Sequence, residues 1–373
     1  MSQPRLIIHA GFHKSGTTAL QEALYSQKVE LRQNGVIYPE TGRKAHHRIA
    51  WALSDKTWGW GKRGGEKTSR KEWTHIAKAI NSNKTETILL SSEFFSELSK
   101  EQILIIFSEI KERKVEVIFT VRPLVKLLGS SYQQYLKYGI TADYVSWLHS
   151  VLDIPGESKI NPTFWMRHFH GKVVTKWVEV LGASNVTVLI VDESKPEFLY
   201  HSINQYLDLP EDFIKPQKAG SNRSLNLEEI ALLLELNKQF PKERNWKEYE
   251  VFIRDGYIRR LTDEVKAPSD SRKLLTPKWA IDKCNEIGSQ IKGELIASGA
   301  IIIGDIESLD SASVPEGEPV YPTEISINHI AQGMLGFDQD LVNKLPLDWI
   351  KNNLIMRYKR KLRAKILRTR KKI

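Results

Sequence analysis

Cysteine is almost absent from this sequence, which has Cys284 as the only one in 373 residues. A single cysteine excludes disulfide bonds within the chain and metal sites built from several thiolates, and it is typical of proteins that fold in a reducing compartment. Long apolar runs are also missing, since no stretch approaches the roughly 20 apolar residues of a membrane-spanning helix. Met1–Pro4 lead directly into an apolar pattern, so we expect no signal peptide or anchor and a cytoplasmic location.

Acidic residues are absent from the end of the chain. Residues 349–373 hold eleven Lys or Arg and no Asp or Glu, so the formal net charge of +10 becomes −1 over residues 1–348. This predicts a basic amphipathic helix over residues 346–373, of the kind that lies peripherally on an anionic membrane surface. A disordered solubilising tail and a nonspecific polyanion binder are alternatives, and specific nucleic-acid binding is not expected. The apolar residues recur at every fourth position, as Ile350, Leu354, Tyr358, Leu362 and Ile366.

An anion-binding loop is predicted near the N terminus, within RLIIHAGFHKSGTTAL at residues 5–20. The apolar run of Leu6, Ile7, Ile8 and Ala10 predicts a buried parallel strand, and apolar residues at helical spacing from Thr17 onward predict a helix. Gly11 and Gly16 allow a tight loop between the two. Unpaired backbone N–H groups and the helix dipole make such a helix N terminus attractive to anions.

This loop has the two glycines of a Walker A motif but lacks the lysine in its usual place. In that motif the lysine directly precedes a Ser or Thr, whereas here Gly16 precedes Thr17 and the lysine is Lys14. The displaced lysine, with no evident magnesium partner, favours an anionic nucleotide held by cation and hydroxyl contacts without a metal. A P-loop kinase or nucleoside triphosphatase is the alternative, with Asp192 as its strand-end aspartate, and a non-catalytic nucleotide or polyanion binder is another.

Further strands are predicted at residues 87–91, 115–121 and 186–191, with a short extended piece at 36–39. Strands and helices alternate, which predicts an α/β fold with a mostly parallel sheet flanked by helices. Residues 226–300 are predicted as a helical extension and residues 301–345, rich in Ser and Pro, as an irregular linker. We therefore expect a core over residues 1–225, followed by this extension, this linker and the basic tail over 346–373.

Polar residues that could carry chemistry follow two of these strands. Glu93 comes just after the strand at 87–91, at the edge where open α/β sheets bind ligands, and is our candidate for a general base. His47, at a predicted helix start, is the second candidate; a capping role for Glu93 is the alternative. Arg122 follows the strand at 115–121, where its guanidinium could bind a phosphate, and Ser130 lies two turns into the next helix.

HKSGTT at residues 13–18, together with Arg122 and Ser130, resembles the nucleotide site of the sulfotransferases that use 3′-phosphoadenosine 5′-phosphosulfate (PAPS). The resemblance covers roughly residues 5–225. It implies a P-loop-like fold, PAPS as co-substrate, no metal, and transfer of a sulfuryl group to an acceptor hydroxyl. Glu93 or His47 would then take the proton, and Lys14 would stabilise the leaving phosphate. The implied PAPS-binding residues are Gly11, His13, Lys14, Ser15, Gly16, Thr17 and Thr18 at the 5′ end and Arg122 and Ser130 at the 3′-phosphate, with Arg223 as a further contact.

Residues 56–73 form a segment rich in Trp, Gly and cations, which is our candidate for binding the acceptor. Indole faces stack on sugar rings, and the Lys and Arg could bind an anionic acceptor. We therefore expect a carbohydrate or glycolipid as acceptor, with Trp58, Trp60 and Trp73 as candidate platforms. A solvated insertion with one Trp turned inward is the alternative.

Overall fold

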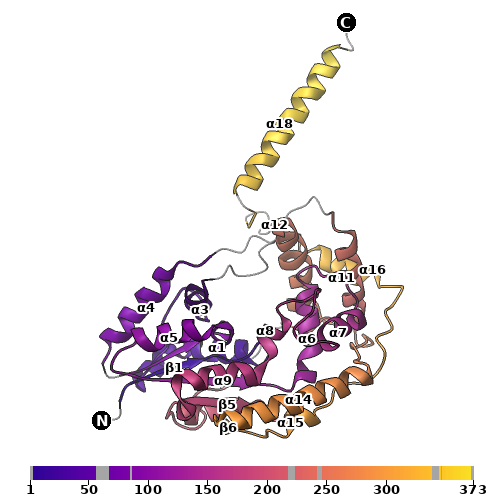
Figure 1. Ribbon diagram of the computed structural model, residues 1–373. Coiled ribbons are helices and arrows are strands. Elements are labelled where there is room, and N and C mark those ends of the chain that lie inside the picture. The colour runs from indigo at the N-terminus through magenta and orange to yellow at the C-terminus, as the bar shows by residue number, and fades with distance from the viewer. Residues whose placement is uncertain are drawn as a thin grey trace. The chain divides into compact units, whose positions relative to one another are not determined.

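The computed structural model describes most of the chain (Figure 1). The chain forms two compact units. The described residues are 3–55, 67–84, 86–216, 223–241, 246–337, 344–345 and 347–370, without the side chains of 362 and 364–370. The first unit comprises Met1–Tyr135, Ile140–Gly220 and Lys273–Tyr321. The second comprises Leu136–Gly139, Ser221–Arg272 and Pro322–Ile373.

A parallel sheet of six strands forms the centre of the first unit, in the order β2-β3-β1-β4-β5-β6. Every pairing between these strands is parallel, and most strand residues are buried because helices cover both faces. The predicted α/β fold and the four longer predicted strands are thus confirmed. The strands are β1 (Arg5–His9), β2 (Val36–Ile37), β3 (Thr87–Ser91), β4 (Lys114–Val121), β5 (Val186–Ile190) and β6 (Ile301–Ile303).

The position of β1 inside the sheet decides where a ligand can bind. Strands β2 and β3 lie on one side of β1, and β4, β5 and β6 lie on the other. In open parallel sheets ligands bind outside the carboxyl ends of the strands, at the point where the strand order changes direction. The loops that follow β1, β3 and β4 meet at that edge.

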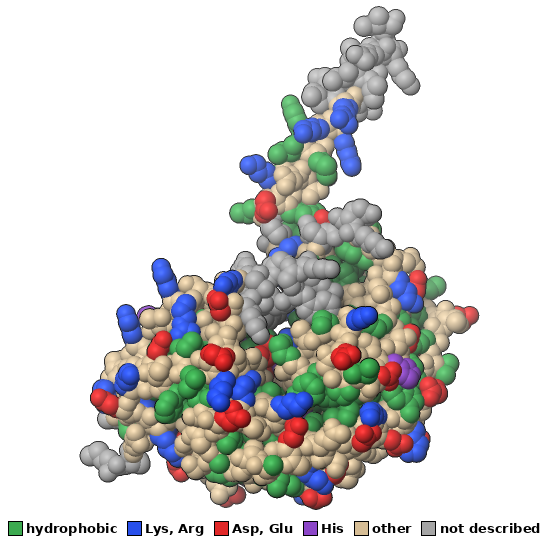
Figure 2. All heavy atoms as spheres, in the orientation of Figure 1, with side chains coloured by type: hydrophobic (Ala, Val, Ile, Leu, Met, Phe, Trp, Pro, Cys, Tyr) green, Lys and Arg blue, Asp and Glu red, His purple; other side chains and the backbone are tan. Residues whose placement is uncertain are grey.

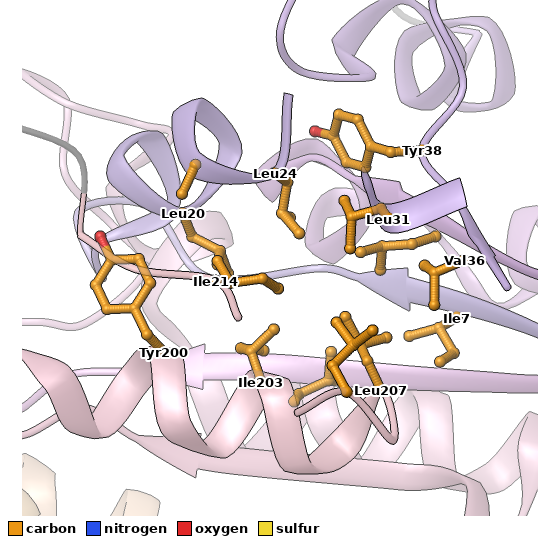
Figure 3. Close-up of a cluster of buried hydrophobic side chains, with 14 of the residues drawn as sticks. Ile7, Leu20, Leu24, Leu31, Val36, Tyr38, Tyr200, Ile203, Leu207 and Ile214 are labelled. Carbon is orange, nitrogen blue, oxygen red and sulfur yellow. The ribbon is translucent and has the colours of Figure 1, made fainter. Parts of the chain in front are cut away.

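One face of the sheet is covered by α1 (Thr17–Ser26) and α10 (Glu197–Tyr206), as Figure 3 shows. Leu20 and Leu24, one turn apart on α1, belong to a buried cluster with Ile203 of α10 and Ile7 of β1. Burying a leucine side chain stabilises the fold by about 2 kcal/mol. This packing places the N terminus of α1 beside the carboxyl end of β1.

The other helices of the first unit surround this core. Helix α9 packs against β4, β5 and α14. The bounds are α2 (Lys28–Gln33), α3 (His47–Ser54), α4 (Arg70–Ser82), α5 (Lys100–Glu109), α6 (Leu124–Leu136, whose last residue belongs to the second unit), α7 (Tyr144–Leu152), α8 (Phe164–His168), α9 (His170–Leu181), α14 (Lys278–Ser298), α15 (Ser308–Ser311) and the 3-10 helices η2 (Glu93–Glu97) and η3 (Ala183–Asn185).

Strand β6 lies in the segment 301–345 that sequence patterns predict as irregular. It pairs with β5 at the sheet edge, with Ile301 opposite Thr187 and Ile303 opposite Leu189. Three β-branched residues are too few for a periodic signal, and only pairing with β5 defines them as a strand. The same segment also contains α15 and α16 (Ile327–Met334).

The second unit is helical. Its described helices are α11 (Leu227–Gln239), α12 (Trp246–Glu248), the π-helix η4 (Tyr249–Ile258), α13 (Arg259–Asp263), α16 and α18 (Leu347–Arg370). Asn226 and Glu229 form a capping box at the start of α11. Glu229 is buried and accepts bonds from both terminal nitrogens of Arg223, and it lies 2.7 Å from His329 Nε2. This cluster ties α16 to α11.

Helix α18 forms where the basic tail is predicted. Trp349 and Ile350 pack beside a small cluster of Val251 and Leu345, and Trp349 Nε1 donates to Glu248. Beyond them, Lys and Arg side chains stand among exposed hydrophobic ones along the described part of the helix (Figure 2). Within the described residues, none of the helices has both the length and the apolarity needed to traverse a lipid bilayer.

Candidate functional site

The loop after β1 is held in a strained backbone conformation. Lys14 has φ of 67° and Gly16 has φ of 86°, both in the left-handed region. Glycine adopts this region readily, whereas a residue with a Cβ loses roughly 1–2 kcal/mol there. The two residues reverse the chain direction so that Gly16 becomes the N-cap of α1. A strained lysine inside a loop is a common feature of binding sites.

Gly11 leaves no space for a side chain. A Cβ added there would overlap the Thr120 hydroxyl and the Thr17 methyl group, and would lie 2.8 Å from His9 Nε2. The loop is therefore pressed against β4, and Phe12 N donates to Thr120 O at 3.0 Å. Glycine at this position allows the backbone to approach the sheet.

Ser15 stabilises the loop from within. Its side chain is fully enclosed (1% of the residue is exposed), and its hydroxyl donates to Phe12 O at 2.6 Å and lies 2.8 Å from Thr120 Oγ1. The predicted contact between Ser15 and a ligand would require this hydroxyl to leave both partners. In this conformation Ser15 positions Lys14 through the backbone.

The N terminus of α1 has the properties of an anion site. Among the described residues no side chain caps it, and its first turn contains no acidic residue. Thr17 is buried with its methyl group against Gly11, whereas Thr18 is exposed and Lys14 is partly exposed. Of the predicted loop residues, Lys14, Gly16 and Thr18 are thus accessible at the carboxyl edge of the sheet.

Arg122 is brought directly to this loop. It lies at the carboxyl end of β4, and its Nη1 donates to Lys14 O at 3.1 Å. It also forms an ion pair with Glu193, which follows β5. Burial lowers the pKa of Arg122 to about 10, so it stays a cation at neutral pH, and its buried Nε has no hydrogen-bond partner among the described residues. This guanidinium has donors left for a second anionic group.

Ser130 is not joined to Arg122 in this conformation. Its hydroxyl donates to Leu127 O, one turn back in α6, at 3.0 Å. Beside Arg122 begins a groove of about 220 Å³. The groove is lined by Pro123, Lys126, residues 190–194, Asp305, Ser308 and Ala312.

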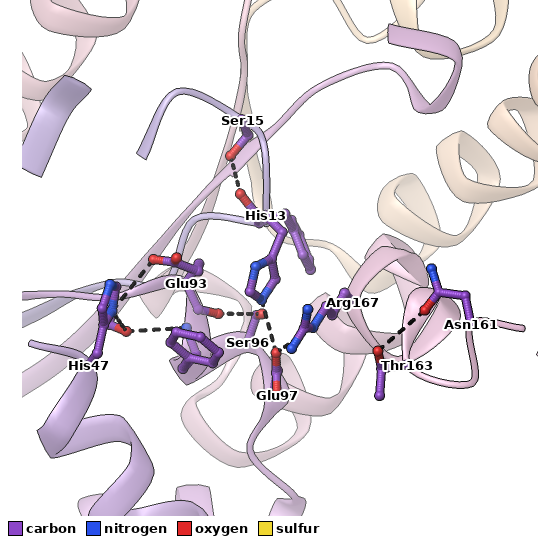
Figure 4. A network of polar contacts seen from close by, with 12 residues as sticks. His13, Ser15, His47, Glu93, Ser96, Glu97, Asn161, Thr163 and Arg167 are labelled. Carbon is purple, nitrogen blue, oxygen red and sulfur yellow. Dashed lines mark hydrogen bonds and ion pairs between the residues drawn. The ribbon is translucent and has the colours of Figure 1, made fainter. Parts of the chain in front are cut away.

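Glu93 and His47 meet at the neighbouring strand end, as Figure 4 shows. Glu93 begins the 3-10 helix after β3, and its Oε2 lies 3.7 Å from His47 Nδ1 and accepts from Gln21 Nε2 at 3.4 Å. The same His47 nitrogen lies 2.8 Å from Ser92 Oγ. His46, its neighbour in sequence, turns the other way, toward Pro39 O and Ser91 N.

The electrostatics leave both groups able to accept a proton. Burial acts to raise the pKa of Glu93, but the nearby imidazoles of His47 and His13 hold that pKa below its ordinary value. Burial lowers the pKa of His47 despite the Glu93 carboxylate. At neutral pH Glu93 is therefore a carboxylate and His47 a neutral imidazole.

Sequence reasoning missed two residues of this site, Glu97 and Arg167. Glu97 ends the same 3-10 helix as Glu93, and its Oε1 lies 2.9 Å from both His13 Nε2 and Arg167 Nε. Burial opposes its ionisation, but Arg167 and His13 lower the pKa of Glu97 to about 2. Two carboxylates four residues apart after a strand were a usable signal. No sequence signal pointed to Arg167, because it lies in α8 and does not follow a predicted strand.

Two other residues predicted to contact a ligand, Arg223 and Trp73, make contacts within the protein. Arg223 belongs to the second unit, where it pairs with Glu229 and also donates to the carbonyls of Leu261 and Val265. Its contact with a phosphate stays a prediction. Trp73 is fully buried and donates to Glu109 at 2.7 Å, so it cannot offer a ring face to a sugar, and this expectation was wrong. Trp58 and Trp60 lie outside the described residues.

Comparison with known proteins gives similarity to solved structures and to no family model or curated protein. Among solved structures, the crystal structure of a sulfotransferase from Alicyclobacillus acidocaldarius matches with 16% sequence identity and a TM-score of 0.41. The match covers 64% of this chain and 93% of that chain. In the described part of the chain, no group of three or more His, Cys, Asp or Glu is placed to hold a metal ion.

Proposed function

We propose that this protein is a sulfotransferase that moves a sulfuryl group from PAPS to an acceptor hydroxyl, on a carbohydrate or a glycolipid. The observation that supports this most directly is the bond from Arg122 Nη1 to Lys14 O, at 3.1 Å. It joins a loop suited to one anionic group to a guanidinium suited to a second one. PAPS carries two such groups, a 5′-phosphosulfate and a 3′-phosphate, on one adenosine.

The residues present fit this co-substrate. The uncapped N terminus of α1, with Lys14 and the exposed Thr18, would bind the 5′-phosphosulfate. Arg122, whose buried Nε has no hydrogen-bond partner in the described part of the chain, would bind the 3′-phosphate. When bound, PAPS supplies the activated sulfuryl group.

The neighbouring strand end supplies the base. As the acceptor oxygen forms its bond to sulfur and the bond from sulfur to the 5′-phosphate oxygen breaks, Glu93 takes the proton of the acceptor hydroxyl. His47, 3.7 Å away, is the second candidate for this proton. Lys14 and the loop N–H groups stabilise the charge that develops on the departing phosphate. The products are a sulfate ester and adenosine 3′,5′-bisphosphate.

A ligand comparison separates this proposal from a P-loop kinase or triphosphatase. Adenosine 3′,5′-bisphosphate at about 100 times its Kd would add about 2.7 kcal/mol to the folding free energy. We expect it to raise the melting temperature more than ATP with magnesium does. A larger shift with ATP and magnesium would overturn the proposal. Transfer of labelled sulfate from PAPS across polysaccharides, glycolipids and phenols would then identify the acceptor class.

We also propose that α18 binds an anionic membrane surface. Exposed Leu354, Ile355 and Tyr358 stand beside cations such as Lys351 and Arg357, and no acidic residue follows Asp348. Each basic residue near an anionic surface contributes about 1 kcal/mol. The full chain should sediment with vesicles containing phosphatidylserine and not with neutral ones, and equal sedimentation with both would contradict this.

A further inference from the structure

Buried polar side chains from three strands lie beneath the loop between β1 and α1. His9 ends β1, Ser91 ends β3, Thr120 lies in β4, and Ser15 belongs to the loop itself. No more than 1% of any of these four residues is exposed. Buried polar groups form their hydrogen bonds within the protein, so the partners of these side chains show what supports the loop.

These side chains form one continuous series of hydrogen bonds, here called the His9 network. His9 Nδ1 lies 2.8 Å from Ser91 Oγ, and His9 Nε2 lies 3.4 Å from Thr120 Oγ1, which is the longest link. Thr120 Oγ1 lies 2.8 Å from Ser15 Oγ, which lies 2.6 Å from Phe12 O. Because β1 lies between β3 and β4, the imidazole connects the two strands on either side of its own.

The direction of every bond in the His9 network is determined. Phe12 O can only accept, so the Ser15 hydroxyl donates to it and the Thr120 hydroxyl donates to Ser15. The single Thr120 proton is then used, so His9 Nε2 carries a proton and donates to Thr120. Burial lowers the pKa of His9 to about 4, so the ring is neutral at pH 7 and Nδ1 accepts from the Ser91 hydroxyl. The network therefore runs from Ser91 to Phe12 and fixes the tautomer of His9.

The last link of the network closes the turn that contains Lys14. Phe12 O accepts from the Ser15 hydroxyl and also from Ser15 N, the latter at 3.2 Å. Lys14 is the third residue of this turn, over residues 12–15, and its φ of 67° persists only where the surroundings impose it. The backbone at this residue sets the direction in which its side chain leaves the loop. Bonds that keep the turn closed therefore position the lysine.

The first link of the network reaches the segment that carries the candidate bases. Ser91 lies two residues before Glu93. Its backbone N donates to His46 Nδ1 and its O accepts from His46 N, both at 2.9 Å, directly beside His47. The network thus joins the candidate bases to the loop of the candidate cation. Their relative placement matters, because a shift of about 1 Å can lower a reaction rate about 100-fold.

We propose that His9 is a positioning residue for Lys14. It acts through the His9 network, by keeping the turn of residues 12–15 closed around the departing phosphate. This inference rests on the proposed function, because it takes Lys14 as the cation for the 5′ group. The imidazole contributes one donor and one acceptor at fixed positions. Glutamine offers the same two groups, whereas leucine offers neither.

The direction of the network is tested by nitrogen NMR of the full chain with labelled histidine. The resonances of His9 are identified by their loss in His9→Gln, and the spectrum shows which ring nitrogen carries the proton. We expect a protonated Nε2 and an unprotonated Nδ1 at pH 7. A proton on Nδ1 would reverse the network and overturn the proposal.

The positioning role is tested by calorimetric titration with adenosine 3′,5′-bisphosphate, which carries the 5′-phosphate. His9→Leu should weaken binding about tenfold, the size expected for one misplaced charged hydrogen bond, and His9→Gln should restore most of it. In a chain that already has Lys14→Gly, His9→Leu should weaken binding by less than about threefold, because the group that it positions is gone. A loss of equal size in both backgrounds would show general structural damage and would overturn the proposal.

A second pair of variants decides the matter if His9→Leu does not fold. Thr120→Val removes one hydroxyl from the middle of the network and keeps the shape of the side chain. It should weaken binding of the bisphosphate about as much as His9→Leu. Thr187→Val is the matched control, because it makes the same change at a buried position of β5, and it should bind as the wild type does.

The outcomes separate this inference from the proposed function. Binding by the wild type that is unchanged in His9→Leu and Thr120→Val would overturn the role of His9 and leave the proposed function intact. No binding of the bisphosphate by the wild type would overturn the proposed function, and the role of His9 with it. Weaker binding in both variants, with rescue in His9→Gln and normal binding in Thr187→Val, supports the inference.

Discussion

Arg122, at the carboxyl end of β4, forms an ion pair with Glu193, three residues beyond the end of β5. The same guanidinium donates to Lys14 O in the loop between β1 and α1. The Glu193 carboxylate is therefore paired with the guanidinium that we propose binds the 3′-phosphate of PAPS. The Glu193 side chain is 45% exposed, so it can turn toward solvent when a phosphate arrives.

Glu193→Gln should strengthen binding of adenosine 3′,5′-bisphosphate about threefold to fivefold, because a competing charge worth at most about 1 kcal/mol is removed. Binding of adenosine 5′-monophosphate, which lacks the 3′ group, should not change. Calorimetric titration of both ligands checks this. An equal gain for both would show that Arg122 does not bind the 3′-phosphate.

Lys14→Gly should remove the catalytic cation without unfolding the loop. The left-handed φ of 67° at this position costs a lysine free energy that glycine does not lose. We expect unchanged or slightly higher thermal stability and a transfer rate lower by about 100-fold, the size typical of a lost transition-state donor. Lys84→Ala, an exposed lysine paired with Glu112, is the control. Normal turnover in Lys14→Gly would contradict the assigned role.

Glu93→Gln should reduce transfer by about 100-fold to 10,000-fold, as expected when a general base is lost. Nucleotide binding should stay, since Glu93 lies outside the loop. His47→Gln should cost less, because the carboxylate remains in place. Single-turnover assays with PAPS, alongside bisphosphate titrations, measure both effects. A larger loss in His47→Gln than in Glu93→Gln would assign the proton to His47.

Gly11→Ala should destabilise the fold by about 1–3 kcal/mol, the usual effect of overfilling a packed site. Its Cβ would overlap Thr120 and Thr17. Gly293→Ala is a matched control, because a Cβ there meets nothing within 4 Å and lies in α14. That change should stabilise the fold by up to about 1 kcal/mol. Urea unfolding of both variants measures the change in the free energy of unfolding, which should be a loss for Gly11→Ala and a gain for Gly293→Ala. Unchanged stability of Gly11→Ala would show that the loop is not pressed against β4.

The ion pairs of Glu97 should make the stability of the fold depend on pH in the acidic range. The pKa of Glu97 is about 2 in the folded chain, against an ordinary value of 4.5. Its stabilisation is therefore complete above pH 4.5 and is lost as the pH falls toward 2. Glu97→Gln should melt below the wild type at pH 7, and the gap should narrow between pH 4.5 and pH 2. Buried histidines such as His9 destabilise both chains in acid, so the difference between them is the informative quantity. A gap that stays constant would contradict the depressed pKa.

Much of the fold follows from local patterns. The strands at residues 87–91, 115–121 and 186–191 are apolar and β-branched, and each is followed by a helical pattern, which is sufficient to predict a parallel sheet. Strand β6 was not predicted, because three consecutive isoleucines show no alternation of apolar and polar residues. Trp73 was misassigned because an aromatic among cations in a Gly-rich segment has no local mark that separates a binding platform from a buried side chain.

The sequence by itself determined the loop between β1 and α1, which it predicts to bind an anion. Gly11, Lys14, Gly16 and Thr18 are close neighbours in the chain, so strand, turn and helix start can be recognised from adjacent residues. Only the tertiary structure decided what surrounds that loop. His13 and Glu97 are 84 residues apart, and Glu97 and Arg167 are 70 apart. They meet because the strand order places the carboxyl ends of β3 and β1 side by side, and pairing between strands depends on long-range packing that no local pattern encodes.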